Sequence, residues 1–159
     1  GDYIDWAREA PRLRIQLAII LKEEDRFIGT IGLRAKPDQP RVARLVYELN
    51  PHDWRTWFAQ EAAAAMLKYV FDELGLHRVW SDTIAQNNRA TIVLERLGFR
   101  REGRLRENKW MNDYWYDSLA YAILADEWRA VVEKAKSNAT AKPPLIAEVY
   151  DEYSAGDGG

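Results

Sequence analysis

Residues 84–107 read I-A-Q-N-N-R-A-T-I-V-L-E-R-L-G-F-R-R-E-G-R-L-R-E and carry the strongest fold signal in the chain. An Asn pair opens the helical part of this stretch, and Ile92, Val93 and Leu97 then recur at the spacing of one helix face. Gly98 follows where a helix end favours a residue of left-handed conformation. The stretch therefore predicts a short helix, ended by Gly98, between two strands.

Three strands are expected before this stretch. Leu13–Leu21 alternates as a strand does, and Phe27–Leu33 is a second apolar run. The charged turn Glu23–Asp25 joins them, which predicts an antiparallel hairpin. A loop over Pro37–Pro40 leads to the third strand, Val42–Leu49.

A change of hydrophobic period predicts the remaining elements. An Ala-rich apolar stripe from Gln60 to Gly75 predicts a helix, and Asp126 is expected to cap a last helix that runs toward Ala135. The other expected elements are the strands His77–Ile84, Arg100–Met111 and Trp115–Leu124, with Asn112–Asp113 as the turn of a second hairpin. This order fits a mixed α/β fold, with helices against the faces of one sheet, better than a parallel doubly wound sheet.

The composition excludes several classes of function. The chain has 159 residues, 47% of them apolar, which suits one packed domain. A formal net charge of -2 gives no indication of a nucleic-acid partner. The absence of Cys excludes disulfides and a cysteine acyl-enzyme. His52 and His77 are too few and too far apart to suggest a metal site, so we expect none.

The apolar runs and the composition of the two ends of the sequence bear on cellular location and domain organisation. No apolar run approaches the roughly 20 residues needed to span a bilayer, and no signal-peptide core opens the chain. We therefore expect a cytoplasmic protein without membrane contact. The folded domain is expected over residues 1–134, followed by a flexible or docking tail over 135–159. Within this tail, Leu145–Tyr153 is apolar enough to add a strand or to dock in a groove.

The order Asn, short helix, L-G-F and E-G-x-L-R resembles the GNAT superfamily of acyl-CoA-dependent N-acyltransferases, in particular its ribosomal-protein alanine acetyltransferase-like branch. The resemblance covers Phe27–Trp128. It implies a mixed, mostly antiparallel sheet with splayed central strands and flanking helices. It also implies direct transfer of an acetyl or related acyl group from acyl-CoA to a primary amine, either a small amine or a peptide N-terminus. A homodimer is compatible with this reading.

The resemblance places acetyl-CoA where two neighbouring strands splay, with its pyrophosphate in the loop before the Gln60 helix. The family pattern there is W-G-x-G-x-A-x-E-A, and Arg55 and Trp57 occupy its two Gly positions. Trp57 cannot supply positive φ without strain, so it is expected either to fill the phosphate pocket or to turn outward and stack on adenine. The candidate cofactor-binding residues are Leu49, Asn50, Trp54, Arg55, Thr56, Trp57, Phe58, Ala59 and Asn87.

Attack by an amine on a thioester needs a polarised carbonyl and a route for protons. Backbone N–H groups around Leu49 and Asn50 are candidates for polarising the carbonyl. Glu48 is the candidate base, and the alternative is a solvated strand carboxylate. Asn87 is expected either to meet the pantetheine arm or to cap the short helix. Ala90 stands where the family has a Ser that donates a proton, so that acid is absent.

Other conspicuous residues are assigned to structure. Trp80, Trp110 and Trp128 fall within predicted elements and are expected in the core. Asp117 matches a position in the family's final hairpin and is expected to be structural.

Two alternatives to an acyltransferase remain. One is a degenerate GNAT-fold binding or regulatory module that no longer uses acyl-CoA, because Arg55, Trp57 and Ala90 replace expected site residues. The other is an assembly protein whose tail docks on a neighbour. The front of the chain is shorter than the family's, and Tyr3–Arg8 is expected to be the remnant of a helix that walls the acceptor site.

Overall fold

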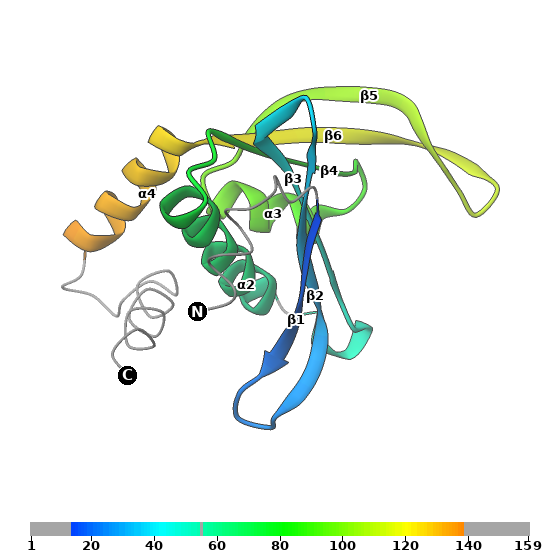
Figure 1. Ribbon diagram of the computed structural model, residues 1–159. Coiled ribbons are helices and arrows are strands. Elements are labelled where there is room, and N and C mark those ends of the chain that lie inside the picture. Colours follow the sequence, from blue (N-terminus) through cyan, green and yellow to red (C-terminus); the bar gives the residue numbers. More distant parts are fainter. Residues whose placement is uncertain (1–13, 55, 139–159) are drawn as a thin grey trace.

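The computed structural model describes residues 14–54 and 56–138 (Figure 1). Three expectations lie outside the described residues: the helix remnant at Tyr3–Arg8, the role of Arg55 and the docking segment Leu145–Tyr153. Within the described residues, no helix is long and apolar enough to cross a membrane.

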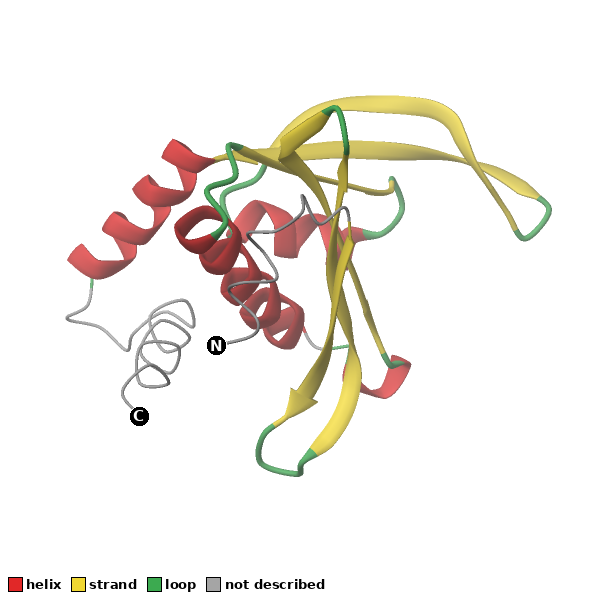
Figure 2. Cartoon of the chain, in the orientation of Figure 1, coloured by secondary structure: helices red, strands yellow, loops and turns green. Residues whose placement is uncertain are grey.

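The predicted order of strands and helices is confirmed (Figure 2). The elements are β1 (Arg14–Leu21), β2 (Arg26–Lys36), β3 (Gln39–Leu49), the short helix η1 (Pro51–Asp53), α2 (Thr56–Lys68), the π-helical turn η2 (Tyr69–Glu73), β4 (Arg78–Ile84), α3 (Asn88–Arg96), β5 (Arg100–Met111), β6 (Tyr114–Leu124) and α4 (Ala125–Ser137). The expected loop at Pro37–Pro40 is shorter than predicted, because β2 and β3 pair as far as Lys36 and Gln39 and leave a tight turn between them.

The sheet has the order β1-β2-β3-β4-β6-β5, and every neighbouring pair is antiparallel except β3 and β4. These two central strands pair in parallel only from Val42 opposite Arg78 to Arg44 opposite Trp80. Beyond that point β3 continues to Leu49 and β4 to Ile84 without pairing with each other. The mixed, mostly antiparallel sheet with splayed central strands is therefore confirmed, and β5 and β6 leave it as a long curved arm (Figure 1).

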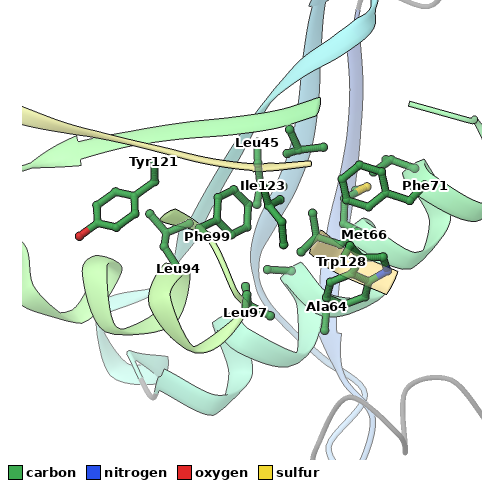
Figure 3. Packing of buried hydrophobic residues seen from close by; sticks show 14 of the residues in the cluster. Leu45, Ala64, Met66, Phe71, Leu94, Leu97, Phe99, Tyr121, Ile123 and Trp128 are labelled. Carbon is green, nitrogen blue, oxygen red and sulfur yellow. The ribbon is translucent and has the colours of Figure 1, made fainter. Parts of the chain in front are cut away.

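One face of the sheet carries the core. Leu45, Val79 and Ile123 lie at alternate positions of three strands and are almost fully buried. Helices α2, α3 and α4 cover this face, and Figure 3 shows Leu94, Leu97 and Trp128 among the residues that fill the space between helices and sheet. The residues that alternate with these point to the opposite face, which the described helices leave uncovered.

The end of α3 has the predicted geometry. Gly98 adopts φ +94°, and the Phe99 N–H donates to the Leu94 carbonyl oxygen at 3.0 Å. Ile92, however, is not part of the buried stripe, because 40% of its surface is exposed, whereas Leu94 is buried. On a helix of 3.6 residues per turn, Leu94 shares the face of Val93, and Ile92 lies off it.

Helix α2 begins earlier than predicted. It starts at Thr56 rather than Gln60, so Trp57, Phe58 and Ala59 belong to its first turn. Positions 55 and 57 carry Arg and Trp in place of Gly, so the sequence does not require a left-handed loop here. Trp57 is not among the described residues with positive φ. The chain thus enters α2 without the positive φ at position 57 that Trp57 could not adopt without strain. The α-helical geometry ends at Lys68, ahead of the π-helical turn.

Two smaller expectations are also corrected. Leu124 precedes helix α4, and its N–H donates a hydrogen bond to the Glu127 carboxylate at 3.4 Å. Asp126 therefore lies in the first turn rather than at the cap. Trp110 is 57% exposed because it lies on the arm, beyond the helices. Trp128 is buried as predicted, and Trp80 is half-buried.

Candidate active site

A cavity of about 450 Å³ lies where β3 and β4 diverge. Just past the last residue pair of β3 and β4, the Ser81 hydroxyl donates a hydrogen bond to the Leu45 carbonyl oxygen at 3.0 Å. Tyr47 and Glu48 line the cavity from β3, Asp82 from β4 and Asn87 from the start of α3. The structure thus brings both candidate catalytic residues, Glu48 and Asn87, to one cavity.

The backbone of β3 offers donors to this cavity. The Asn50 N–H donates to the Ile28 carbonyl oxygen on β2 at 2.7 Å, so the expectation that it polarises a carbonyl is wrong. Because successive N–H groups of a strand point in opposite directions, those of Leu49 and Tyr47 point toward β4. At this level β4 no longer pairs with β3, and these N–H groups face the splay.

Glu48 lies on the face of the sheet away from the helices, opposite Thr30 of β2. Its side chain is exposed at the edge of the cavity. Within the part of the chain that the structure describes, its carboxylate makes no ion pair or hydrogen bond. The geometry therefore leaves this carboxylate accessible to a substrate.

Asn87 caps α3, which was one of the two expectations for it. Its Oδ1 accepts a hydrogen bond from the Ala90 N–H at 3.2 Å. Its Nδ2 has no hydrogen bond to any described residue and belongs to a side chain that lines the cavity. The cap fixes the side chain while leaving this donor available, so the two expected roles are compatible.

The segment after β3 is held by local bonds. The Trp54 Nε1–H donates to the Leu49 carbonyl oxygen at 2.6 Å, and the Arg89 guanidinium lies 5.5 Å from the Trp54 ring centre. Asp53 is buried and receives two hydrogen bonds from Arg26, both 2.9 Å long. These contacts fix the direction in which the chain enters α2.

Trp57 turns outward. Its side chain is 44% exposed, and its ring meets the Phe58 ring edge-on at 5.8 Å. Both rings line a second cavity, of about 1230 Å³, between α2 and the β1–β2 hairpin. Neither lines the cavity at the splay, so Trp57 does not fill it. The first turn of α2, residues 56–59, places a helix start with its positive dipole end at this loop, an arrangement that favours a phosphate.

Tyr47 is a functional candidate that the sequence did not reveal. Its hydroxyl is shielded from solvent and has no hydrogen-bond partner among the described residues. Burial raises the pKa of Tyr47 to about 12, so the phenol stays protonated at neutral pH. A buried orphan donor beside the splay is expected to meet an acceptor that a ligand supplies.

Asp82 joins three elements across the uncovered face. Its Oδ1 accepts from Arg44 at 2.6 Å, and its Oδ2 pairs with the Lys109 ammonium group at 2.8 Å. Burial of Asp82 opposes ionisation, but the bonds from Lys109 and Arg44 outweigh it and hold the pKa of this carboxyl below its usual value. The network could not be read from the sequence, because its members are far apart along the chain.

The family described as the GNAT acetyltransferase domain matches residues 1–100, and the chain belongs to this family. A solved GNAT acetyltransferase from Bacillus anthracis is 31% identical, with a TM-score of 0.64 over 70% of this chain and 66% of that one. The spermidine/spermine N-acetyltransferase SpeG from Vibrio cholerae has a TM-score of 0.69 over 81% of this chain and 76% of its own. At 21% identity, that likeness supports the fold alone.

The curated relatives agree with this assignment. The uncharacterized N-acetyltransferase YoaA of Bacillus subtilis is 34% identical over 69% of this chain. The ribosomal protein uS5-alanine N-acetyltransferase of Escherichia coli is 28% identical over 43% of this chain and 35% of its own length, which supports the ribosomal-protein acetyltransferase branch. The chain spans 62% of YoaA and 64% of a second Bacillus relative, YnaD.

Proposed function

We propose that this chain transfers an acetyl group from acetyl-CoA to a primary amine by direct attack. The observation that carries the proposal is the splay between β3 and β4, which leaves a cavity beside the cap of α3 and backbone donors of β3 that β4 does not pair. Acetyl-CoA supplies an activated thioester when bound. The matched family and the N-acetyltransferase relatives support this choice of reaction.

The donor set fits such a co-substrate. The N–H groups of Leu49 and Tyr47 suit the amides of an extended pantetheine arm, as a neighbouring strand would. The Asn87 amide adds a side-chain donor at the same cavity. The first-turn N–H groups of α2 suit the pyrophosphate. Ala59 is buried in this turn, which keeps the helix start close to the sheet.

Proton transfer is assigned to two residues of β3 that lie on opposite faces of the sheet at the splay. Glu48, from the uncovered face, accepts a proton from the amine, directly or through water. Tyr47, protonated at neutral pH, donates a hydrogen bond toward the sulfur that departs. This assignment gives Tyr47 the role that a Ser has in the family at the position of Ala90.

The alternative of a degenerate module rests on Arg55, Trp57 and Ala90 at positions that the chemistry uses and on the short front of the chain. The outward Trp57 ring, which lines the other cavity and not the splay, gives this alternative no further support. The acceptor, a small amine or a peptide N-terminus, and a homodimer remain proposals. So does the boundary near residue 134, although α4 continues to Ser137.

Isothermal titration with acetyl-CoA, followed by mass spectrometry of an amine panel, tests the proposal. We expect measurable heat, thermal stabilisation and acetylated product. The Ala90→Trp variant should lose binding because Ala90 lines the splay cavity, whereas Ala130→Trp, on the exposed side of α4, should not. No heat and no stabilisation at millimolar acetyl-CoA would reject the function.

A further inference from the structure

Three arginines lie side by side on the face of the sheet that the described helices leave uncovered. Arg14 of β1 is the register partner of Arg34 of β2, which is in turn the partner of Arg44 of β3. Residues directly opposite each other share a face, and like charges in such positions repel. We call these three residues the arginine row.

The carboxylates near the arginine row do not balance it. Asp82 is already shared between Arg44 and Lys109. Among the described residues, the Arg14 guanidinium bonds only to the neutral amide of Gln16, at 3.4 Å. Arg34 makes no hydrogen bond or ion pair with any described residue, and its side chain is exposed. Among the described residues, the group of three arginines and Lys109 therefore pairs with one carboxylate, that of Asp82, which contacts Arg44 and Lys109.

The arginine row borders the candidate active site. Arg34 and Arg44 line the same cavity as Tyr47, Glu48 and Asn87. Glu48 lies four residues after Arg44 on the same strand face, so their backbones are separated by about 13 Å. The cavity is therefore acidic near the proposed base and cationic at the arginine row.

The sheet surface beside Arg34, between Glu48 and the arginine row, carries no side chain at Gly32. Gly32 lies next to Arg34 on this face and lines the cavity. A Cβ at this position would lie 2.5 Å from the Ile15 carbonyl oxygen, so no larger residue fits without moving β1. The absence of a side chain gives a ligand access to the guanidinium groups along the sheet surface.

We propose that the arginine row binds an anionic group, a carboxylate or a phosphate, on the same molecule that presents the acceptor amine. The free Arg34 guanidinium offers paired donors in the geometry of either group. This inference rests on the proposed function, since it names the class of acceptor for that site. It disfavours polyamines, because a second cationic group would meet Arg34 and Arg44 at the position where the anion belongs.

A matched set of amines tests the inference. Propylamine, β-alanine, 3-aminopropyl phosphate and 1,3-diaminopropane, each also with a six-carbon spacer, are compared by kcat/KM with acetyl-CoA. We expect the anionic acceptors to exceed the neutral and dicationic ones about tenfold or more. The better of the carboxylate and phosphate members identifies the natural group. Equal values across the set would overturn the inference.

Variants assign the effect to Arg34. Arg34→Gln should raise KM for the anionic acceptors about tenfold to hundredfold more than it raises KM for propylamine, whereas Arg34→Lys should retain part of the preference. Arg129→Gln on α4 is the matched control, since its residue is exposed and pairs with Asp126. Added salt should weaken only the anionic acceptors. An unchanged preference in Arg34→Gln would refute the assignment.

A binding experiment separates this inference from the proposed function. Titration of 3-aminopropyl phosphate into the unmodified chain should give heat that Arg34→Gln abolishes, whether or not acetyl-CoA is used. Absence of acetyl-CoA binding alone rejects the proposed function. Absence of 3-aminopropyl phosphate binding, or equal binding by both chains, rejects the arginine row as an anion site.

Discussion

At the scale of single residues, the cavity combines groups that folding alone does not explain. Tyr47 presents a buried hydroxyl with no hydrogen-bond partner among the described residues, and an orphan of this kind destabilises the free protein. Asp82, in contrast, is half-buried with two cationic partners and stabilises it. The two residues therefore predict opposite responses to mutation.

Replacing Tyr47 by Phe removes the orphan hydroxyl. We expect the free energy of unfolding to stay equal or to rise by up to about 1 kcal/mol, while kcat for amine acetylation falls. Urea denaturation and initial rates measure the two effects. Tyr121→Phe is the control, because the Tyr121 hydroxyl donates to Glu95 at 2.9 Å and its loss should destabilise by about 1 kcal/mol. A Tyr47→Phe variant with unchanged kcat would contradict the proposed donor role.

Asp82 predicts a pH dependence of stability. Its folded-state pKa lies below the usual value of 3.8, so its contribution is present above that value and is lost as pH falls through the folded pKa. Asp82→Asn should therefore destabilise at pH 7, by about 1–2 kcal/mol, and the difference should shrink as the pH falls below 3.8 and the carboxylate becomes protonated. Urea unfolding at several pH values measures this. Asp126→Asn, in an exposed pair on α4, should change stability by less than about 0.5 kcal/mol throughout.

At the scale of elements, the end of α3 is the sharpest structural constraint. Gly98 combines φ +94° with close packing, since a Cβ would lie 2.6 Å from Val131 Cγ2 on α4. Gly75 also has positive φ, +64°, but a Cβ there meets nothing within 4 Å. Substitution of Gly75 therefore tests backbone strain alone, whereas substitution of Gly98 tests strain together with steric overlap.

Gly98→Ala should therefore destabilise more than Gly75→Ala. Backbone strain alone costs about 1–2 kcal/mol, and the overlap with α4 adds to it in Gly98→Ala. Gly103→Ala, with open space and no positive φ, should change stability by less than about 1 kcal/mol. Urea denaturation ranks the three variants, and equal losses for Gly98→Ala and Gly75→Ala would show that Val131 moves aside freely.

Local signals explain why this part of the fold could be predicted. The helix over residues 88–97 and its Gly are adjacent in sequence, and the turn at Asn112–Asp113 has the positive φ values that these residue types favour. The start of α2 lies earlier than predicted because Arg55 and Trp57 stand where the family's loop pattern has Gly, so the helix can begin at Thr56. The arginine row and the Asp82 network depend on strand register, which joins residues far apart in sequence. Likewise, nothing at Asn50 shows which neighbour its N–H will meet.

At the scale of the whole molecule, the arm formed by β5 and β6 extends away from the helices (Figure 1). Its end carries an exposed aromatic pair, Trp110 and Trp115, with ring centres 5.1 Å apart. Aromatic pairs across strands stabilise a hairpin. A β-bulge between Leu105 and Lys109 interrupts the pairing, and Asp117 holds it by accepting from the Glu107 N–H at 2.8 Å, which fits its expected structural role.

Trp110→Ala should loosen the arm without affecting the core. We expect faster amide hydrogen exchange over residues 106–115 and a global free energy of unfolding changed by less than about 1 kcal/mol, because the lost contacts lie outside the core. Exchange measured by mass spectrometry, beside urea denaturation, distinguishes the two effects. Equal acceleration of exchange in α2 would instead show that the arm and the body unfold together.

The short parallel seam between β3 and β4 also has a mechanical consequence. Among the described residues, the two halves of the sheet are joined by three residue pairs, the Ser81 hydrogen bond, the bond from the His77 N–H to the Arg41 carbonyl oxygen and the Arg44–Asp82 ion pair. Because this seam is so short, we expect it to be the weakest line of the sheet under a pulling force. A molecule bound across the splay would act as a clasp between the halves. In single-molecule stretching between β3 and β4, the rupture force should therefore rise when acetyl-CoA is present.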